Sequence, residues 1–234
     1  MKIKIILAVF IPALFFSFVL LNSSCDKDKD DNGDDKVPAT VTDIDGNVYK
    51  VIQIGEQIWM GENLRVTKLT NGNPIPFFEV DSQWVQADTM GYCWYDNNPS
   101  HAATYGALYN YFAVETRKLC PEGWRMPTDA EWTKMTDLYG GEIAAGGALK
   151  GTTNWDSPNK GATNESGFNA MPGGMRFNYP GNFYYMGSFA NYWTGTVFSS
   201  SHAWYRRLRH NYATILRANI DKAYGYSVRC IKED

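Results

Sequence analysis

A run of polar and charged residues divides this chain into two unequal parts. From Asp26 to Lys36 the sequence is DKDKDDNGDDK, which contains no apolar side chain. Such a run can bury nothing that would offset the conformational entropy lost on folding, so we expect a disordered tether there. A packed core must therefore come from residues 37–234, which hold no low-complexity stretch, long linker or fixed-period repeat. We predict a single domain over these residues.

The residues before the tether have the pattern of an export signal. Two lysines precede an apolar run from Ile5 to Leu21, and two serines stand directly before Cys25. The segment that ends at this cysteine resembles a lipobox, where bacterial lipoproteins are lipid-modified and cleaved, although Asn22 is an imperfect fit. We predict a signal peptide over residues 1–24 and an acylated Cys25 inserted in outer-membrane lipid. The alternative is an uncleaved membrane anchor, but the run is short for a bilayer span and contains Pro12.

The tether itself, residues 25–36 with the lipidated cysteine, carries a further indication. Its acidic run resembles the export signal that follows the lipidated cysteine in Bacteroidota lipoproteins and sends them to the outer face of the outer membrane. A solvated linker without any targeting role is the alternative. We therefore expect a lipid-anchored outer-membrane protein whose domain is exposed at the cell surface.

Charge argues against a role in nucleic-acid binding. The formal net charge is −3 with only three histidines, whereas contact with phosphates requires clustered lysines and arginines. The one basic run is Arg206-Arg207-Leu208-Arg209-His210. Its alternation with apolar residues favours a solvated strand face, and contact with nucleic acid or another acidic ligand is the alternative.

Three cysteines remain once Cys25 is assigned to lipid, an odd number in a compartment that permits disulfides. One disulfide and one free thiol is the simplest arrangement. We predict that Cys120 pairs with Cys230, because each lies in a segment that we expect to be structurally fixed. Closing a loop of about 110 residues could contribute up to roughly 4 to 5 kcal/mol. Cys93, between Tyr92 and Trp94, is then expected to be a buried thiol.

The beginning of the domain predicts a three-stranded antiparallel meander. Asp45-Gly46-Asn47 is a strong turn signal between two apolar runs, and Gly55-Glu56 turns the chain again into residues 57–60. The acidic run from Asp43 superficially resembles a calcium loop. The position of its closing carboxylate is occupied by Ile54, so turn chemistry is favoured.

Two main helices are expected after the meander. Residues 105–114 place apolar side chains on one helical face, and Thr128 with Glu131 forms a capping box at the start of a second helix. The Gly-, Asn- and Pro-rich stretch 146–187 predicts long loops with short strands at 168–171 and 175–177. Strands are then expected at 192–198, 203–209, 214–220 and 226–231 as a C-terminal antiparallel sheet. The order indicates an α+β fold.

Several ordered segments together resemble the Fibrobacter succinogenes major paralogous domain family. They are Asp43–Tyr49, Ile54–Leu64, Tyr105–Asn110, Cys120–Trp132, Ala148–Lys150, Gly167–Phe168 and Ser227–Cys230. The resemblance extends from about Thr40 to Lys232. Arg125–Trp132 and Val228–Cys230 also look like signatures of formylglycine-generating-enzyme domains, which implies a C-type-lectin-like fold without implying an activity.

No catalytic arrangement is evident in the sequence. An oxidase similar to formylglycine-generating enzyme would need two closely spaced cysteines in its C-terminal part, and beyond Cys120 only Cys230 is present. Neither a Gly-x-Ser-x-Gly elbow nor a His-Glu-x-x-His run occurs, and the usual calcium-lectin signatures are missing. We therefore expect no enzyme activity, no cofactor and no metal. An enzyme related to formylglycine-generating enzyme is a remote alternative.

Aromatic side chains indicate a binding function instead. Trp193 and Trp204 are expected to alternate into the core, which leaves Trp155, Tyr184 and Tyr185 as loop aromatics that could contact a ligand. Flat rings stack on sugar faces while neighbouring amides bind hydroxyl groups. We predict a non-catalytic domain that binds polysaccharide or glycoprotein. A protein-contacting adhesin or structural surface component is the alternative.

Overall fold

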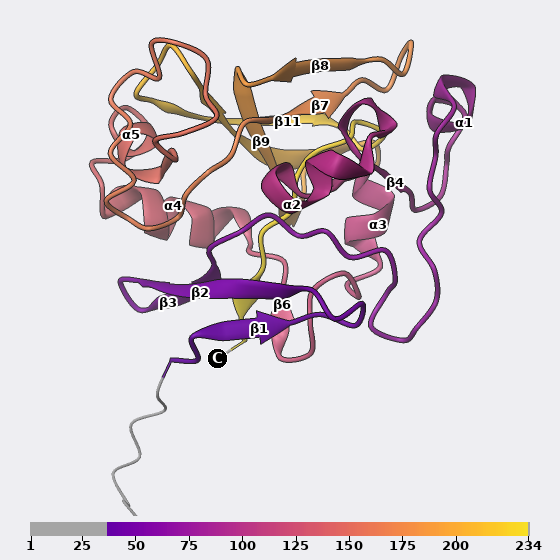
Figure 1. Ribbon diagram of the computed structural model, residues 1–234, viewed down its shortest axis with the longest axis horizontal. Helices are drawn as coiled ribbons and strands as arrows, with labels where there is room; N and C mark the ends of the chain where they lie inside the picture. The colour runs from indigo at the N-terminus through magenta and orange to yellow at the C-terminus, as the bar shows by residue number, and fades with distance from the viewer. Residues whose placement is uncertain (1–36, 234) are drawn as a thin grey trace, which may run out of the picture. The chain divides into compact units, whose positions relative to one another are not determined.

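The computed structural model describes residues 37–233, and the predicted signal peptide, lipidated Cys25 and tether lie outside these residues. Two five-stranded sheets, a small two-stranded sheet and several short helices make up the described part. In Figure 1 the N-terminal sheet lies at the bottom and the C-terminal sheet at the top, with helix α4 to the left. The predicted α+β class is confirmed.

The N-terminal sheet begins with the expected meander. Its first three strands are antiparallel neighbours: β1 (Thr40–Thr42), β2 (Val48–Ile54) and β3 (Gln57–Met60). Both oxygens of the Asp43 carboxylate bind donors of the first turn: Oδ1 accepts from the backbone N–H groups of Asp45 and Asn47, and Oδ2 accepts from Asn47 Nδ2 and the Tyr49 hydroxyl. Turn chemistry thus accounts for this acidic run, as predicted.

Two distant segments complete the N-terminal sheet. Strand β12 (Ile231–Lys232) lies between β3 and β6 (Trp124–Arg125), where Ile231 pairs with Trp59 and Arg125. The prediction of a strand over residues 226–231 in the C-terminal sheet was therefore wrong. Tyr226 and Ser227 form only isolated bridges before the chain crosses to the other sheet.

The C-terminal sheet has the strand order β11-β10-β9-β7-β8. Its strands are β7 (Gly173–Arg176), β8 (Phe183–Met186), β9 (Phe189–Val197), β10 (His202–Arg209) and β11 (Ile215–Asp221). The strands predicted at 192–198, 203–209 and 214–220 are confirmed as β9, β10 and β11. The sheet is not wholly antiparallel. Strand β7 has the antiparallel β8 on one side and β9 on the other, and β9 runs parallel to β7.

Of the two predicted helices, only the second forms as expected. Helix α4 (Asp129–Asp137) begins with the capping box of Thr128 and Glu131. The single helix predicted over residues 105–114 does not form. Its place is taken by the end of α2 (Ala102–Tyr105), strand β5 (Leu108–Tyr109) and helix α3 (Tyr111–Glu115). Strand β5 pairs with β4 (Tyr92–Cys93). Gly106 ends α2 with φ of 73°, and a Cβ there would lie 2.8 Å from the Leu64 carbonyl oxygen.

The remaining elements are short. They are α1 (Asp81–Val85), α5 (Ala145–Leu149) and two 3₁₀ turns, Tyr95–Asn97 and Pro99–His101. The short strand expected at residues 175–177 is present as β7, which begins at Gly173. Residues 168–171 form no strand, and only Ala170 makes an isolated bridge, with Lys150.

A shared core joins the two sheets around α4. Trp59 of β3, Trp132 of α4 and Phe168 contact one another edge to face, and Tyr192 of β9 packs against the same group. Such aromatic pairs stabilise a core beyond the area they bury. The core therefore fixes α4 and the C-terminal sheet relative to each other.

The cysteine predictions are confirmed. Cys120 and Cys230 form a disulfide with their Cα atoms 5.9 Å apart, which ties β6 and β12 together just outside their paired residues. Cys93 is a free, buried thiol. Burial raises the pKa of this thiol to about 12, with Arg176 acting in the opposite direction.

Candidate binding face

The predicted ligand-binding aromatics occupy two separate places. Tyr184 and Tyr185 lie on strand β8 and not in a loop, and they expose 37% and 45% of their surface. Trp155 does lie outside the strands and helices, but it is half-buried, and its Nε1 donates a hydrogen bond to the Ala170 carbonyl at 3.0 Å. Only the two tyrosines therefore present accessible rings side by side.

The two tyrosine rings belong to a longer row. Tyr184 contacts Phe177 at 4.6 Å and Tyr185 at 5.9 Å between ring centroids. Tyr185 in turn stacks on Phe189 of β9, at 4.4 Å and an interplanar angle of 16°. Four rings thus follow one another, from Phe177 just after β7 through the two tyrosines of β8 to Phe189 of β9.

An irregularity in the backbone brings the adjacent tyrosines together. Successive side chains of a regular strand point to opposite faces of the sheet. Tyr185 has φ of 66°, and Gly174, which lies between the residues of β7 that pair with β8, has φ of 67°. This left-handed conformation interrupts the alternation, so that the rings of Tyr184 and Tyr185 contact each other.

Two arginines of β10 continue the row. Arg207 pairs with Asn191 and Arg209 with Phe189 across the β9–β10 ladder, so these side chains share one face. The guanidinium of Arg207 lies 5.1 Å from the Phe189 ring centroid and that of Arg209 lies 5.7 Å from it. Arg209 also lies 5.5 Å from the ring centroid of Tyr212, which is 46% exposed. We call Tyr184, Tyr185, Phe189, Arg207, Arg209 and Tyr212 the aromatic–arginine face.

A hollow borders this face. Its volume is about 330 Å³. It is lined by Glu142, Ile143, Arg207, Arg209, Tyr212, Thr214, Ile215 and Leu216. The two arginines therefore face open space beside exposed rings.

A buried lysine holds the end of the face in place. Lys150 Nζ donates hydrogen bonds to the carbonyl oxygens of Lys160, Arg209 and Tyr212 at 2.8, 3.1 and 2.9 Å. Its side chain is wholly buried, and burial lowers its pKa to about 8. Lys150 thus fixes the turn between β10 and β11, which carries Tyr212.

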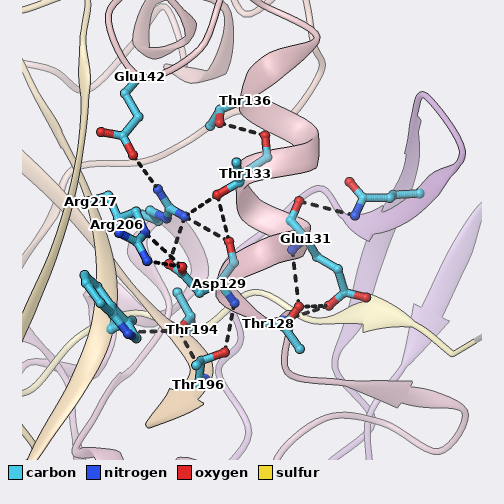
Figure 2. A network of polar contacts seen from close by, with 12 residues as sticks. Thr128, Asp129, Glu131, Thr133, Thr136, Glu142, Thr194, Thr196, Arg206 and Arg217 are labelled. Atoms are coloured by element: carbon cyan, nitrogen blue, oxygen red, sulfur yellow. Dashed lines mark hydrogen bonds and ion pairs between the residues drawn. The ribbon is translucent and has the colours of Figure 1, made fainter. Parts of the chain in front are cut away.

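The opposite face of β10, shown in Figure 2, carries arginines that are bound by carboxylates. Arg206 is fully buried and donates to Asp129 Oδ1 and Thr133 Oγ1 of α4 at 2.8 and 2.9 Å, and to Glu142 at 3.2 Å. Arg217 of β11 binds the second oxygen of the same Asp129 carboxylate. The expectation that the basic run is a single solvated face was therefore wrong for Arg206, because the strand pleat directs it toward α4.

A family model for the Fibrobacter succinogenes major domain matches residues 52–232, from within β2 to the last residue of β12. This match includes the whole C-terminal sheet and all the helices described above. The chain belongs to the Fibrobacter succinogenes major domain family. The family predicted from the ordered motifs is thus confirmed. No curated protein and no solved structure matches the chain.

This Fibrobacter succinogenes major domain has two larger grooves on either side of Cys120. One, of about 570 Å³, is lined by residues including Val114, Arg125 and Met126, and the other, of about 650 Å³, by residues including Thr70 and Glu122. Their volumes exceed that of the hollow beside β10, but neither is lined by a predicted ligand-binding residue. We therefore keep the aromatic–arginine face, and not these larger grooves, as the candidate ligand-binding site.

Within residues 37–233 of the domain, no group of three or more His, Cys, Asp or Glu side chains is placed to hold a metal ion. The same residues contain no helix that is both long and apolar enough to cross a bilayer.

Sequence reasoning missed Phe189, Arg207, Arg209 and Tyr212 as neighbours of the predicted tyrosines. The prediction of one solvated face for the basic run did not separate Arg207 and Arg209 from Arg206. The sequence could not show that β9 lies beside β10 and places Phe189 against Arg207 and Arg209, because this depends on strand order and register.

Proposed function

We propose that this chain is a lipid-anchored surface protein of the outer membrane whose domain binds polysaccharide or glycoprotein without catalysing a reaction. The proposal rests above all on the exposed rings of Tyr184 and Tyr185 in one row with Phe189. Flat aromatic faces stack on the apolar faces of sugar rings. A row held by strands offers such faces at fixed spacing, which favours a ligand of repeated units over a single small molecule.

A non-catalytic role is supported by the state of the cysteines. Two of the three in the described part are joined to each other, and the third is buried with a raised pKa. The pair of reactive thiols that an oxidase similar to formylglycine-generating enzyme requires is therefore missing from residues 37–233. We propose that the domain shares the C-type-lectin-like architecture of such enzymes but serves for binding.

A protein-contacting adhesin is the second candidate, and one observation favours it. Val197 and Phe198 at the end of β9 expose 47% and 53% of their surface, and Phe198 packs against Trp204. Neighbouring exposed apolar side chains are typical of protein contacts. This apolar pair provides a matched control for the aromatic–arginine face.

Binding to a polysaccharide array tests the main proposal. The detergent-solubilised full chain should bind one or more polysaccharides, with and without calcium. Tyr184→Ala/Tyr185→Ala should lose this binding, whereas Phe198→Ala should retain it. Retention of binding in the tyrosine variant, or no binding to any glycan, would exclude this face as a glycan site. Capture of a protein partner that depends on Phe198 would instead support the adhesin.

The anchor has a test of its own. Cells given labelled palmitate should incorporate it into the wild-type chain and not into the Cys25→Ser variant. Protease added to intact cells should digest the domain if it is exposed at the surface. Labelling of Cys25→Ser, or protection of the domain in intact cells with digestion after lysis, would contradict the anchor or the surface location, respectively.

A further inference from the structure

The aromatic–arginine face carries two arginines, Arg207 and Arg209, that form no ion pair with the residues the structure describes. We infer that the ligand of this face is an acidic polysaccharide, whose carboxylates bind Arg207 and Arg209 while its sugar rings stack on Tyr184 and Tyr185. This inference rests on the proposed function and adds the chemical class of the ligand.

The first step is the absence of acidic partners. Arg206 and Arg217, on the opposite face of the same two strands, share Asp129 in ion pairs of 2.8 Å. In the part of the chain from residue 37 to 233, neither Arg207 nor Arg209 forms an ion pair. Among the described residues that line the hollow, the one acidic side chain is the half-exposed Glu142, whose Oε1 accepts a hydrogen bond from Arg206. The charge on the open face is therefore left for a ligand.

The second step is preorganisation of the two guanidinium groups. Arg207 Nε donates to Asn191 Oδ1 at 2.6 Å, and Nη2 donates to the Tyr226 hydroxyl at 3.1 Å. Arg209 makes no side-chain hydrogen bond to the described residues, but Lys150 holds its carbonyl and its guanidinium lies over two rings. Arg209 therefore keeps a planar N–H edge that matches a carboxylate, whereas Arg207 offers its Nη1 group, because its Nε and Nη2 already donate to Asn191 and Tyr226.

The third step separates a polysaccharide from other acidic chains. The row begins with three rings, those of Tyr184, Tyr185 and Phe189, and continues with the cation of Arg209 and the ring of Tyr212. A uronic acid residue carries both features that such a row recognises, because each sugar ring has an apolar face and a carboxylate. A nucleic acid would require a larger basic surface, and the chain has a net charge of −3. An acidic peptide would leave the exposed rings without flat partners.

Affinity measurements with defined polymers test the inference. The full chain is titrated with polygalacturonate, with its methyl-esterified form and with a neutral galactan. We expect binding to polygalacturonate at least about tenfold tighter than to the esterified form, and a loss of affinity at higher ionic strength. Arg207→Gln/Arg209→Gln should lose this preference. The control Arg117→Gln/Lys118→Gln removes the same charge from exposed positions elsewhere and should keep it.

The outcomes distinguish this inference from the proposed function. Equal binding of acidic and neutral polymers that depends on Tyr184 but not on the arginines would overturn the inference and leave the proposed function standing. No binding to any polysaccharide would overturn both. Equal or tighter binding of poly-glutamate or single-stranded DNA would overturn the assignment to a polysaccharide. If the double variant is unfolded by circular dichroism, Arg209→Gln alone decides, because its side chain makes no hydrogen bond within the described residues.

Discussion

Arg206 and Arg207 are neighbours on β10 and have the same chemistry, yet they lie in opposite environments. Arg206 is wholly buried and bound by carboxylates of Asp129 and Glu142. Arg207 is half-buried among rings, and its hydrogen-bond partners are uncharged. The pleat of one strand thus separates a charge that holds the fold together from one that is available to a ligand. This distinction can be tested by changing each side separately.

The largest effect is expected from Arg206→Gln. It removes one member of a buried charge network and leaves Asp129 with Arg217 alone, so the free energy of unfolding should fall by about 3–5 kcal/mol. Urea unfolding monitored by tryptophan fluorescence measures the change. A cost below about 1 kcal/mol would show that the two faces of β10 do not differ as described.

Lys150→Met should have the next largest effect. Three carbonyl oxygens lose their shared donor, and the expected cost is about 2 kcal/mol. The turn that carries Tyr212 should also loosen and weaken ligand binding. Lys160→Met changes an exposed side chain nearby and serves as the control. Unchanged affinity in a folded Lys150→Met variant would show that this turn does not position the face.

Buried tyrosines should make the domain sensitive to alkali. Burial raises the pKa of Tyr226 above its ordinary value of about 10, so the unfolded chain loses this proton first. Stability that is present below pH 10 is then lost as the pH rises, by up to about 1.4 kcal/mol per pH unit for one such group. Tyr226→Phe should make the decline shallower, as followed by unfolding at several pH values. The same slope in Tyr226→Phe as in wild type would contradict the assignment.

Arg209→Gln should have the smallest effect on stability. Its guanidinium makes ring contacts but no hydrogen bond within residues 37–233, so the free energy of unfolding should change by no more than about 0.5 kcal/mol. Urea unfolding beside Arg206→Gln gives a matched pair on one strand. A loss as large as that of Arg206→Gln would make Arg209 a structural residue and remove it from the binding face.

Features encoded within a few residues could be predicted from the sequence. Thr128 and Glu131 bind each other's backbone N–H groups across one helical turn, and their spacing alone indicates the start of α4. The turn at Asp43 is equally local. The false helix over 105–114 came from apolar spacing, although Asn110 was a visible cap: its side chain accepts from the Ala113 N–H and starts α3.

The composition of the binding face could not be predicted, because it depends on which strands become neighbours. Tyr184 meets Phe177 because β7 and β8 pair, whereas Tyr185 stacks on Phe189 locally, across the short turn that joins β8 to β9. Arg209 meets Phe189 through the register of the β9–β10 ladder. Neither strand order nor register follows from periodicity, which fixes only which residues share a face.

The position of β12 limits when the N-terminal sheet can finish folding. Its two residues lie between β3 and β6, so the sheet that opens the domain lacks an inner strand until Ile231 arrives. Synthesis or translocation that proceeds from the N-terminus therefore cannot deliver a finished first half. The N-terminal sheet can be completed only after Ile231 and Lys232 have been added, so its assembly depends on contacts that are distant along the chain.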